Sequence, residues 1–394
     1  MADARSASAA GHGTDADASA DLAACRARLV HGSRTFLAAS WLLPPSVRDP
    51  ACALYAFCRE ADDEVDGQQD GHVPAARPGS SRSPGRPGHP DARHSALHKA
   101  AQAAAHGGTE AVQALRRRLD AVYAGRPAAQ PADRALARVV RQHRIPQALP
   151  AALIDGFAWD AEGRRCDTLA DLHAYAARVA GSVGAMMALL MGVREPQALA
   201  RACDLGVAMQ LSNIARDVGE DAAQGRLYLP RTWLAEAGLD ADRWLARPAA
   251  GTALASVVAR LLAEADRLYA QVGAGVAALP APCRPGINAA RFLYADIGHE
   301  VARRGHDPLA GRARPAAWRR AAGLTRAVLH LQPGAAALAC APLPATLPLV
   351  EAVTGPLPAD TWRTAAPLPP RVETVLTLFE RLERRDRGWP VPGT

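Results

Sequence analysis

The sequence predicts an all-α protein, and three observations support this prediction. Ala and Leu dominate a hydrophobic fraction of 49%, whereas aromatic residues make up only 5%, and this composition favours helices over strands. Apolar residues recur at helical spacing almost continuously over residues 22–324. No segment shows the alternating pattern of a half-buried strand. A chain of 394 residues can also bury a core with room for a cavity.

Composition divides the chain into three parts. Residues 1–21 are rich in Ala, Asp, Ser and Gly and are expected to be disordered. Residues 22–324 form the helical domain, and within it the Gly-, Pro-, Ser- and Arg-rich segment 67–96 predicts a flexible surface insertion. Residues 325–394 form a Pro- and Ala-rich C-terminal extension, with a final helix expected near 371–384.

The chain is basic, with a formal net charge of +7 and a pI near 9.3. Such a charge suits nucleic acid, anionic lipid or a polyanionic substrate. Two stretches, 77–93 and 303–320, carry visible excess. Neither interleaves aromatic residues with the charge as single-strand nucleic-acid binders do, so we expect no nucleic-acid partner.

Cysteine usage and hydropathy predict a cytoplasmic location. The seven cysteines are odd in number and form no C-x-x-C pair, which is typical of reduced thiols in the cytosol. The first residues lack the apolar segment of a signal peptide. The longest uncharged helical run, Val179 to Val193, is shorter than the roughly 20 apolar residues that span a membrane.

The first of two acidic segments is YAFCREADDEVD at 55–66. On a helix with about 100° per residue, four of its polar residues fall within about 60° of arc. These residues are Tyr55, Arg59, Asp62 and Asp66. Asp62 and Asp66 are thus i,i+4 neighbours on one face, and we expect Asp63 and Glu64 to point elsewhere.

The second acidic segment, QLSNIARDVGED at 210–221, has a similar polar stripe. The stripe covers about 80° of arc among apolar neighbours. Its members are Gln210, Asn213, Asp217 and Asp221. Like charges at i,i+4 destabilise a helix, so two such pairs suggest a compensating cation. Mg²⁺ suits carboxylate oxygens and shares its remaining ligands with water and phosphates.

Beyond these two segments, the chain resembles the squalene/phytoene synthase family of head-to-head prenyl synthases over about residues 22–320. The two acidic segments resemble the family's aspartate-rich motifs, and the second extends through GRLYLP to residue 230. HGSRTFLAASWLLP at 31–44 resembles the opening segment of the family. YAARVAGSVGAMMALLMGV at 175–193 resembles a central segment, and ARFLYADIGHEVARRGHDP at 290–308 resembles a late helix.

The resemblance implies the isoprenoid synthase fold, a helical bundle around a central substrate cavity. The phytoene-forming members are the most similar, which implies that two geranylgeranyl diphosphates condense through a cyclopropyl diphosphate to phytoene, for carotenoid biosynthesis. A synthase that makes squalene or dehydrosqualene from farnesyl diphosphate is the nearest alternative. A non-catalytic assembly protein is an alternative of another class, although such a protein would be expected to lose its metal carboxylates.

The resemblance also assigns residues to roles. It implies that Asp62 and Asp66 face Asp217 and Asp221 across the cavity and bind Mg²⁺, with Mn²⁺ as an alternative ion. It places Gln210, Asn213 and Arg216 beside the second pair, with Asn213 as a further metal ligand. The helical projection supports Gln210 and Asn213 but not Arg216, which projects about 100° from Asp217. The remaining substrate contacts that the resemblance implies are Ser33, Arg34, Thr35, Phe36, Tyr55, Arg59, Tyr175, Val179, Gly181, Arg226, Tyr228 and Tyr294.

The cavity wall, cofactors and partners complete the expectations. An apolar wall is expected from Gly181, Ala185, Met186, Met187 and Leu190, although the two glycines of this helix, Gly181 and Gly184, equally suit close helix packing. No NAD(P)H and no ATP are expected. A phytoene desaturase is the expected downstream partner. For the basic stretch 303–320, two interpretations stay open: a solvated face, or peripheral contact with anionic lipid of the inner membrane.

Overall fold

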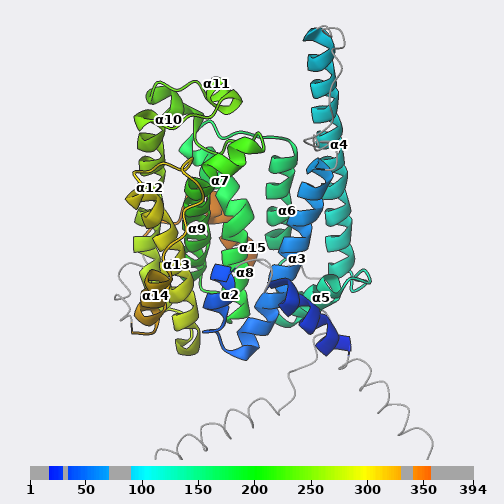
Figure 1. Cartoon of the computed structure of the whole chain (residues 1–394). Coiled ribbons are helices and arrows are strands. Elements are labelled where there is room, and N and C mark those ends of the chain that lie inside the picture. The colour runs from blue at the N-terminus through cyan, green and yellow to red at the C-terminus, as the bar shows by residue number, and fades with distance from the viewer. Residues whose placement is uncertain (1–16, 30–33, 71–89, 330–339, 356–394) are drawn as a thin grey trace, which may run out of the picture. The chain divides into compact units, whose positions relative to one another are not determined.

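A computed structural model of the chain shows a bundle of helices (Figure 1). The structure describes residues 17–29, 34–70, 90–329 and 340–355. This part of the chain contains no strand, so the all-α prediction is confirmed.

The N-terminal half begins with a helix over residues 17–29. It continues with α2 (Arg34–Ser40), α3 (Pro45–Asp70), α4 (Pro90–Tyr123), α5 (Pro131–His143), α6 (Ala148–Ala161), α7 (Leu169–Ala176), the π-helix η1 (Ala177–Gly181) and α8 (Ser182–Leu190). The C-terminal half contains α9 (Pro196–Ala223), α10 (Arg231–Glu236), α11 (Ala241–Ala246), α12 (Thr252–Ala277), η2 (Ala281–Cys283), α13 (Arg284–Arg303), α14 (Ala317–Leu329), η4 (Pro344–Thr346) and α15 (Leu347–Thr354).

Helix α9 is the central element. It contacts α8 and η1 on one side and α12 and α13 on the other, whereas α3, α4, α5 and α6 form a second group (Figure 1). Its ends are defined by local chemistry. The Glu195 carboxylate accepts hydrogen bonds from the backbone N–H groups of residues 197 and 198, at 3.0 and 2.7 Å. Gly225, with φ of +76°, turns the chain back at the other end.

Two glycines let α9 approach its neighbours closely. A Cβ at Gly184 of α8 would lie 2.2 Å from the carbonyl oxygen of Ala202. A Cβ at Gly206 of α9 would lie 2.2 Å from the carbonyl oxygen of Ala180. Both helices therefore pack backbone against backbone, which only glycine permits at this separation.

The π-helix η1 sits between α7 and α8. A π turn holds more than 3.6 residues, so it rotates every later side chain relative to a continuous α-helix. The face that α8 presents therefore differs from the one that a regular helical period through residues 175–193 predicts.

A buried charge network holds α3 against α4 and α5. The Arg118 guanidinium donates two hydrogen bonds to the Asp133 carboxylate, at 2.7 and 3.1 Å, and a third to Glu64. Asp133 is fully buried, and a buried carboxylate is tolerated when such a partner neutralises it. Glu64 thus points away from the Asp62 face, as predicted.

The helical unit differs from the predicted domain limits at several points. Helices α3 and α4 extend into the predicted 67–96 insertion from both sides, and residues 71–89 lie outside the described residues. The compact unit extends past residue 324 to Thr354. Helix α15 packs against α9 and α6 and buries Leu349, Val350 and Val353 in the main core. Residues 1–16 of the predicted disordered segment lie outside the described residues, but 17–21 are helical, and Asp21 is buried and pairs with Arg134, so the prediction is wrong there. The predicted final helix lies wholly outside the described residues.

Candidate active site

An apolar cavity of about 300 Å³ lies alongside α9. Its walls come from α2, α3, η1, α8, α9, α12 and α13. Most of the lining side chains are aliphatic, aromatic or sulfur-containing, with Gln210 and Asn213 as polar members near one end and Arg201 at the other. On α9 the lining residues run from Ala198 to Asn213. These positions are 15 residues apart, so the cavity follows roughly 22 Å of helix.

The aromatic lining comes from three helices. Phe36 of α2 and Tyr55 of α3 stack with ring centroids 5.3 Å apart and planes at 15°. Tyr294 of α13 also lines the cavity. Three residues that the sequence assigned to substrate are thus brought together on its wall.

The acidic face of α3 lies toward solvent beside this cavity. The Arg59 guanidinium donates to Asp62 at 3.1 Å and also contacts Asp63 at 2.8 Å. The side chains of Arg59 and Asp62 are 45% and 39% exposed. Asp63 also contacts Arg28 at 3.6 Å, and Arg59 is long enough to reach carboxylates on both flanks of the helix.

The acidic end of α9 is more enclosed. The Arg216 guanidinium binds Asp217 through two nitrogens, with Nε at 2.7 Å from Oδ1. Their side chains are 15% and 18% exposed. Arg216 projects about 100° from Asp217, as chain neighbours on a helix do, but its long side chain reaches around the helix to the Asp217 carboxylate. Arg312, which follows α13, adds a contact to Asp217 at 3.4 Å and one to Glu220 at 2.6 Å.

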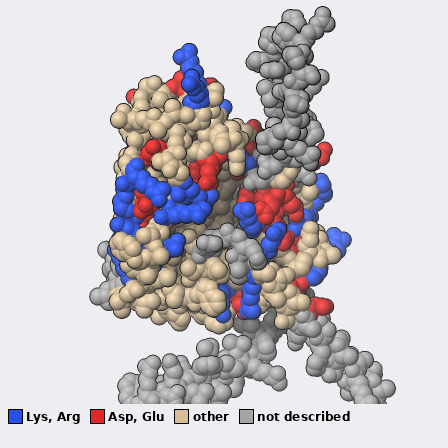
Figure 2. Space-filling view, viewed as in Figure 1, with Lys and Arg blue, Asp and Glu red and all other residues tan. Residues whose placement is uncertain are grey.

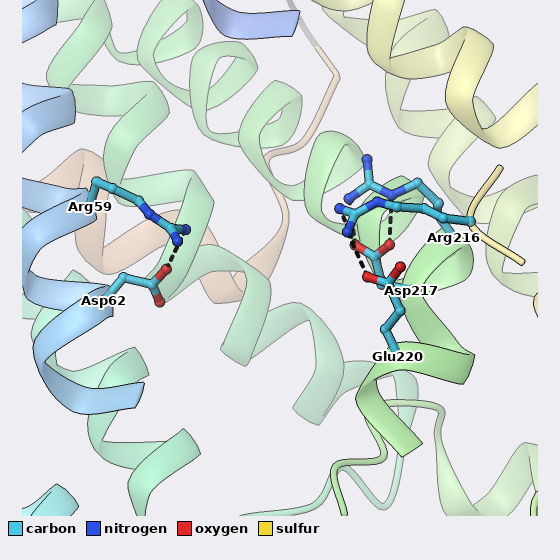
Figure 3. Close-up of polar contacts among 6 residues, drawn as sticks. Arg59, Asp62, Arg216, Asp217 and Glu220 are labelled. Carbon is cyan, nitrogen blue, oxygen red and sulfur yellow. Dashed lines mark hydrogen bonds and ion pairs between the residues drawn. The ribbon is translucent and has the colours of Figure 1, made fainter. Parts of the chain in front are cut away.

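The two acidic groups face each other. Figure 3 shows Asp62 on α3 and Asp217 on α9 projecting toward the space between these helices. Figure 2 shows acidic and basic side chains gathered on the two sides of a hollow on this face of the molecule. The arrangement places carboxylates from two walls around one opening.

Asp221 has a strongly perturbed environment. Burial, followed by the charge of Asp217, raises the pKa of its carboxyl to about 7. Asp160 and Glu220 act in the same direction, and Arg226 opposes them. The nearby guanidinium groups therefore offset the burial and the carboxylate repulsion at Asp221 only in part, and such a carboxyl group suits a site that takes up an external cation.

The residues at this end fit a magnesium ion. Asn213 lines the cavity, and its side-chain oxygen is buried without a hydrogen-bond partner within the described part of the chain. A buried oxygen of this kind, one turn from Asp217, is a suitable ligand for a hard cation. Among the described side chains no three acidic, histidine or cysteine groups form a preassembled cluster.

A second polar group lies beside Asp221. The hydroxyls of Tyr175 and Tyr228 both donate to the Asp160 carboxylate, at 2.9 and 2.7 Å. Their rings stack with centroids 4.9 Å apart. Sequence reasoning assigned both tyrosines to the site but missed Asp160, because a lone aspartate at the end of an apolar helix carries no distinguishing pattern.

The structure separates the remaining predictions into three groups. Val179, Gln210 and Asn213 line the cavity. Gly181 does not, because it faces α15 and α9, with its nearest non-local atom in Leu349. Ser33 and the side chains of Arg34 and Asp66 lie outside the described residues, and Thr35 is half-buried.

The predicted apolar wall is partly wrong. Of the five residues expected there, Met187 lines the cavity. The other four do not line it: Gly181, Ala185, Met186 and Leu190. Their places are taken by Val179, Ala180, Val183, Gly184 and Met191. The π-helix η1 explains the difference, since it shifts the face that α8 presents.

Arg312 was also missed as a site residue. In the sequence, Arg312 stands out only as a member of the basic stretch 303–320. Its position beside Asp217 depends on how the loop after α13 folds back over α9, which no local pattern encodes.

A central apolar cavity between helices, with acidic motifs from two walls at one end, defines a class of protein. A sequence model of the family described as "Squalene/phytoene synthase" matches residues 29–321. The chain belongs to this family.

Within the family, the chain is similar to proteins named phytoene synthase. It is 45% identical to the one from Cereibacter sphaeroides, with 94% of this chain and 96% of the relative covered. It is 46% identical to the one from Rhodobacter capsulatus, with 94% and 98% covered.

Solved structures agree with the fold. A dehydrosqualene synthase in complex with a ligand matches with a TM-score of 0.65 and 26% identity, covering 79% of this chain and 97% of that one. A squalene synthase from Alicyclobacillus acidocaldarius matches with a TM-score of 0.59 at 22% identity, covering 74% and 97%. The fold is therefore the isoprenoid synthase fold of these proteins.

Proposed function

We propose that this protein is a phytoene synthase, which joins two molecules of geranylgeranyl diphosphate. The observation that carries the proposal is an apolar cavity with one end beside the two acidic helices. Such a cavity suits a substrate with an anionic head and a long hydrocarbon tail. Similarity to two proteins named phytoene synthase, over 94% of the chain, favours this product over others.

In this proposal the head group lies at the acidic end. The proposed ligands of Mg²⁺, or of Mn²⁺ in its place, are Asp62, Asp66, Asn213, Asp217 and Asp221. When bound, the metal neutralises the diphosphate and makes it a better leaving group. Arg59, Arg216 and Arg226 bind diphosphate oxygens, and Arg312 is added to them by its place beside Asp217. Guanidinium groups suit this role because they present several N–H donors in one plane.

The cavity supports the cationic steps. Loss of diphosphate from one substrate leaves an allylic cation, which the double bond of the second substrate attacks. Loss of a proton from the resulting cation to released diphosphate then closes the ring of a cyclopropyl diphosphate. Loss of the second diphosphate opens that ring, and loss of a proton to released diphosphate leaves the central double bond. A wall of aliphatic and aromatic side chains keeps water away from these cations. The stacked Phe36 and Tyr55 rings offer their π-faces to positive charge.

Product identification tests the proposal directly. The purified protein should convert geranylgeranyl diphosphate and Mg²⁺ to phytoene, without NADPH or ATP. Preferential use of farnesyl diphosphate would favour the alternative, squalene or dehydrosqualene synthesis, and NADPH dependence would point to squalene. Absence of Mg²⁺-dependent diphosphate release from either substrate would favour a non-catalytic assembly role.

We further propose peripheral membrane contact, since the product is a hydrocarbon that a downstream desaturase would take from a bilayer. No helix in the described part of the chain is long and apolar enough to span a membrane. In the basic stretch, Arg303 and Arg304 are paired with acidic residues of α13. Helix α14 instead exposes Trp318 and Leu329, at 64% and 72%.

Liposome co-sedimentation tests this contact. We expect binding to anionic vesicles that falls with salt and with the double change Trp318→Ser and Leu329→Ser. Binding that both changes leave intact would contradict the assignment of this surface.

A further inference from the structure

Asp160 connects three segments that are distant in the sequence. It lies in the last turn of α6 and accepts the hydroxyl protons of Tyr175, from α7, and Tyr228, from the segment after α9. The two rings stack, with their planes at 21°. Trp159 also stacks with Tyr175, with ring centroids 6.4 Å apart. This arrangement fixes both hydroxyls on one carboxylate.

Both tyrosines remain hydrogen-bond donors across the working pH range. Tyr175 is buried, and burial raises its pKa well above the ordinary value. Burial also raises the pKa of Tyr228. Because neither hydroxyl loses its proton, both stay in place as neutral donors, and Asp160 is the acceptor that two such donors require.

The tyrosine segment leads back to the acidic end of α9. Gly225 turns the chain, and the backbone N–H of Arg226 donates to the carbonyl oxygen of Asp221 at 2.8 Å. Tyr228 follows two residues later. The bond from Tyr228 to Asp160 therefore fixes a segment whose Arg226 charge acts on Asp221.

We propose that Asp160 is a positioning residue for the acidic end of α9, which it holds through Tyr228. This inference rests on the proposed function, because it gives a metal-binding role to that end of the helix. Asp160 acts through Tyr228 and Asp221 and does not itself bind the metal ion. A residue with this outer role commonly changes metal affinity by about 10–100-fold when it is replaced.

The first experiment replaces the carboxylate by an amide. In Asp160→Asn the side chain keeps its size, loses its charge and keeps one oxygen acceptor for two donors. Binding of Mn²⁺ is measured without substrate, by electron paramagnetic resonance, with and without inorganic pyrophosphate. We expect affinity to fall by about 10-fold or more. An affinity within twofold of the wild type, in a folded variant, would overturn the proposal.

Asp155→Asn is the matched control. Asp155 lies on the same helix, but its side chain is 50% exposed and pairs with Arg116 of α4. The same chemical change there should leave Mn²⁺ affinity unchanged. Equal losses in the two variants would show a non-specific effect of charge on α6 and would contradict the positioning role.

A second pair of variants keeps the experiment decisive if Asp160→Asn fails to fold. Tyr228→Phe removes one hydrogen bond but preserves the charge, and Tyr175→Phe does the same on the other side. We expect Tyr228→Phe to weaken Mn²⁺ binding several-fold and Tyr175→Phe to weaken it less, since only Tyr228 belongs to the segment that carries Arg226. Unchanged affinity in Tyr228→Phe would refute the positioning role.

The kinetic readout separates this inference from the proposed function. In Asp160→Asn the apparent Mg²⁺ requirement should rise, and saturating Mg²⁺ should restore part of kcat with little change in KM for the prenyl substrate. A wild-type product other than phytoene would refute the proposed function but leave the Mn²⁺ result standing. Normal phytoene formation by the wild type, together with unchanged Mn²⁺ binding in Asp160→Asn, would support the proposed function and refute the positioning role of Asp160.

Discussion

The two acidic helices carry similar motifs in different surroundings. On α3, Asp62 is 39% exposed and shares Arg59 with Asp63. On α9, Asp217 is 18% exposed and binds Arg216 through two nitrogens. Burial and neighbouring carboxylates raise the pKa of Asp221 to about 7. Similar motifs thus give a solvent-exposed carboxylate wall on α3 and an enclosed wall on α9. In the enclosed wall, burial and neighbouring carboxylates disfavour the ionised form of Asp221.

This difference suggests different roles in metal binding. The α3 wall is hydrated, so its carboxylates need little rearrangement to meet a hydrated cation. The α9 wall must lose a proton and reorganise guanidinium contacts before its carboxylates are available. We therefore expect the α9 wall to couple metal binding to pH, to diphosphate and to stability, and the α3 wall to do so much less.

Removing one carboxylate from each wall should give the largest effects. Asp62→Asn and Asp217→Asn should each lower kcat/KM by roughly 1,000-fold, since a metal ligand contributes several kcal/mol to the transition state. Only Asp217→Asn should also lower the free energy of unfolding, by about 1–2 kcal/mol, because it leaves the enclosed Arg216 without its partner. Steady-state kinetics and urea unfolding measure the two effects.

Asp63→Asn is the control for this pair. Asp63 also contacts Arg59 but lies outside the predicted metal face. Its turnover should stay within about threefold of the wild type. Equal losses for Asp62→Asn and Asp63→Asn would show that general charge on α3, and not one face, binds the metal.

Disrupting the close packing of α8 against α9 should have the next largest effect, on the free energy of unfolding. In Gly184→Ala the new Cβ would lie 2.2 Å from the Ala202 carbonyl oxygen, which should cost about 1–3 kcal/mol of unfolding free energy. In Gly181→Ala the nearest atom is a Leu349 methyl group at 3.4 Å, so the cost should be well below that of Gly184→Ala. Urea unfolding measures both losses. A larger loss of unfolding free energy in Gly181→Ala than in Gly184→Ala would contradict this account.

The pH dependence should differ between the walls. The pKa of Asp221 is raised in the folded state, from 3.8 to about 7, so its contribution to stability is complete below pH 4 and is lost as pH rises through 7. Mg²⁺ favours the ionised carboxylate, so the rise in Tm that Mg²⁺ produces should grow by roughly 2–4 °C between pH 5.5 and pH 8.

Asp221→Asn should remove most of this pH dependence, whereas Asp62→Asn should retain it. Thermal unfolding in EDTA and in Mg²⁺ measures both. The proposed coupling would be wrong if the dependence survived in Asp221→Asn.

The smallest predicted effect concerns Arg312. Its side chain is 39% exposed, so Arg312→Gln should weaken inorganic pyrophosphate binding in the presence of Mg²⁺ by about threefold. Arg320→Gln changes an exposed residue of α14 that forms no ion pair within the described residues and should leave calorimetric affinity unchanged. An equal loss in both variants would indicate a general effect of net charge.

Some errors of the sequence prediction have identifiable causes. The projection of residues 210–221 grouped Gln210 and Asn213 correctly, because lining a cavity from a regular helix depends only on period. It did not indicate the contact between Arg216 and Asp217, because this contact depends on the length and conformation of the Arg216 side chain. The prediction of which α8 residues line the cavity was partly wrong because η1 rotates the helix after Gly181. No local sequence pattern indicates a π turn.

The sequence by itself determined the all-α class, the two acidic stripes and the family, because helical period and motif spacing are local properties of the chain. Only the tertiary structure decided that Asp160 holds two tyrosines, that Arg312 reaches Asp217, and that α15 belongs to the core. These contacts join residues far apart in the chain. Their geometry depends on how closely helices such as α8 and α9 pack, and this is set by the whole bundle.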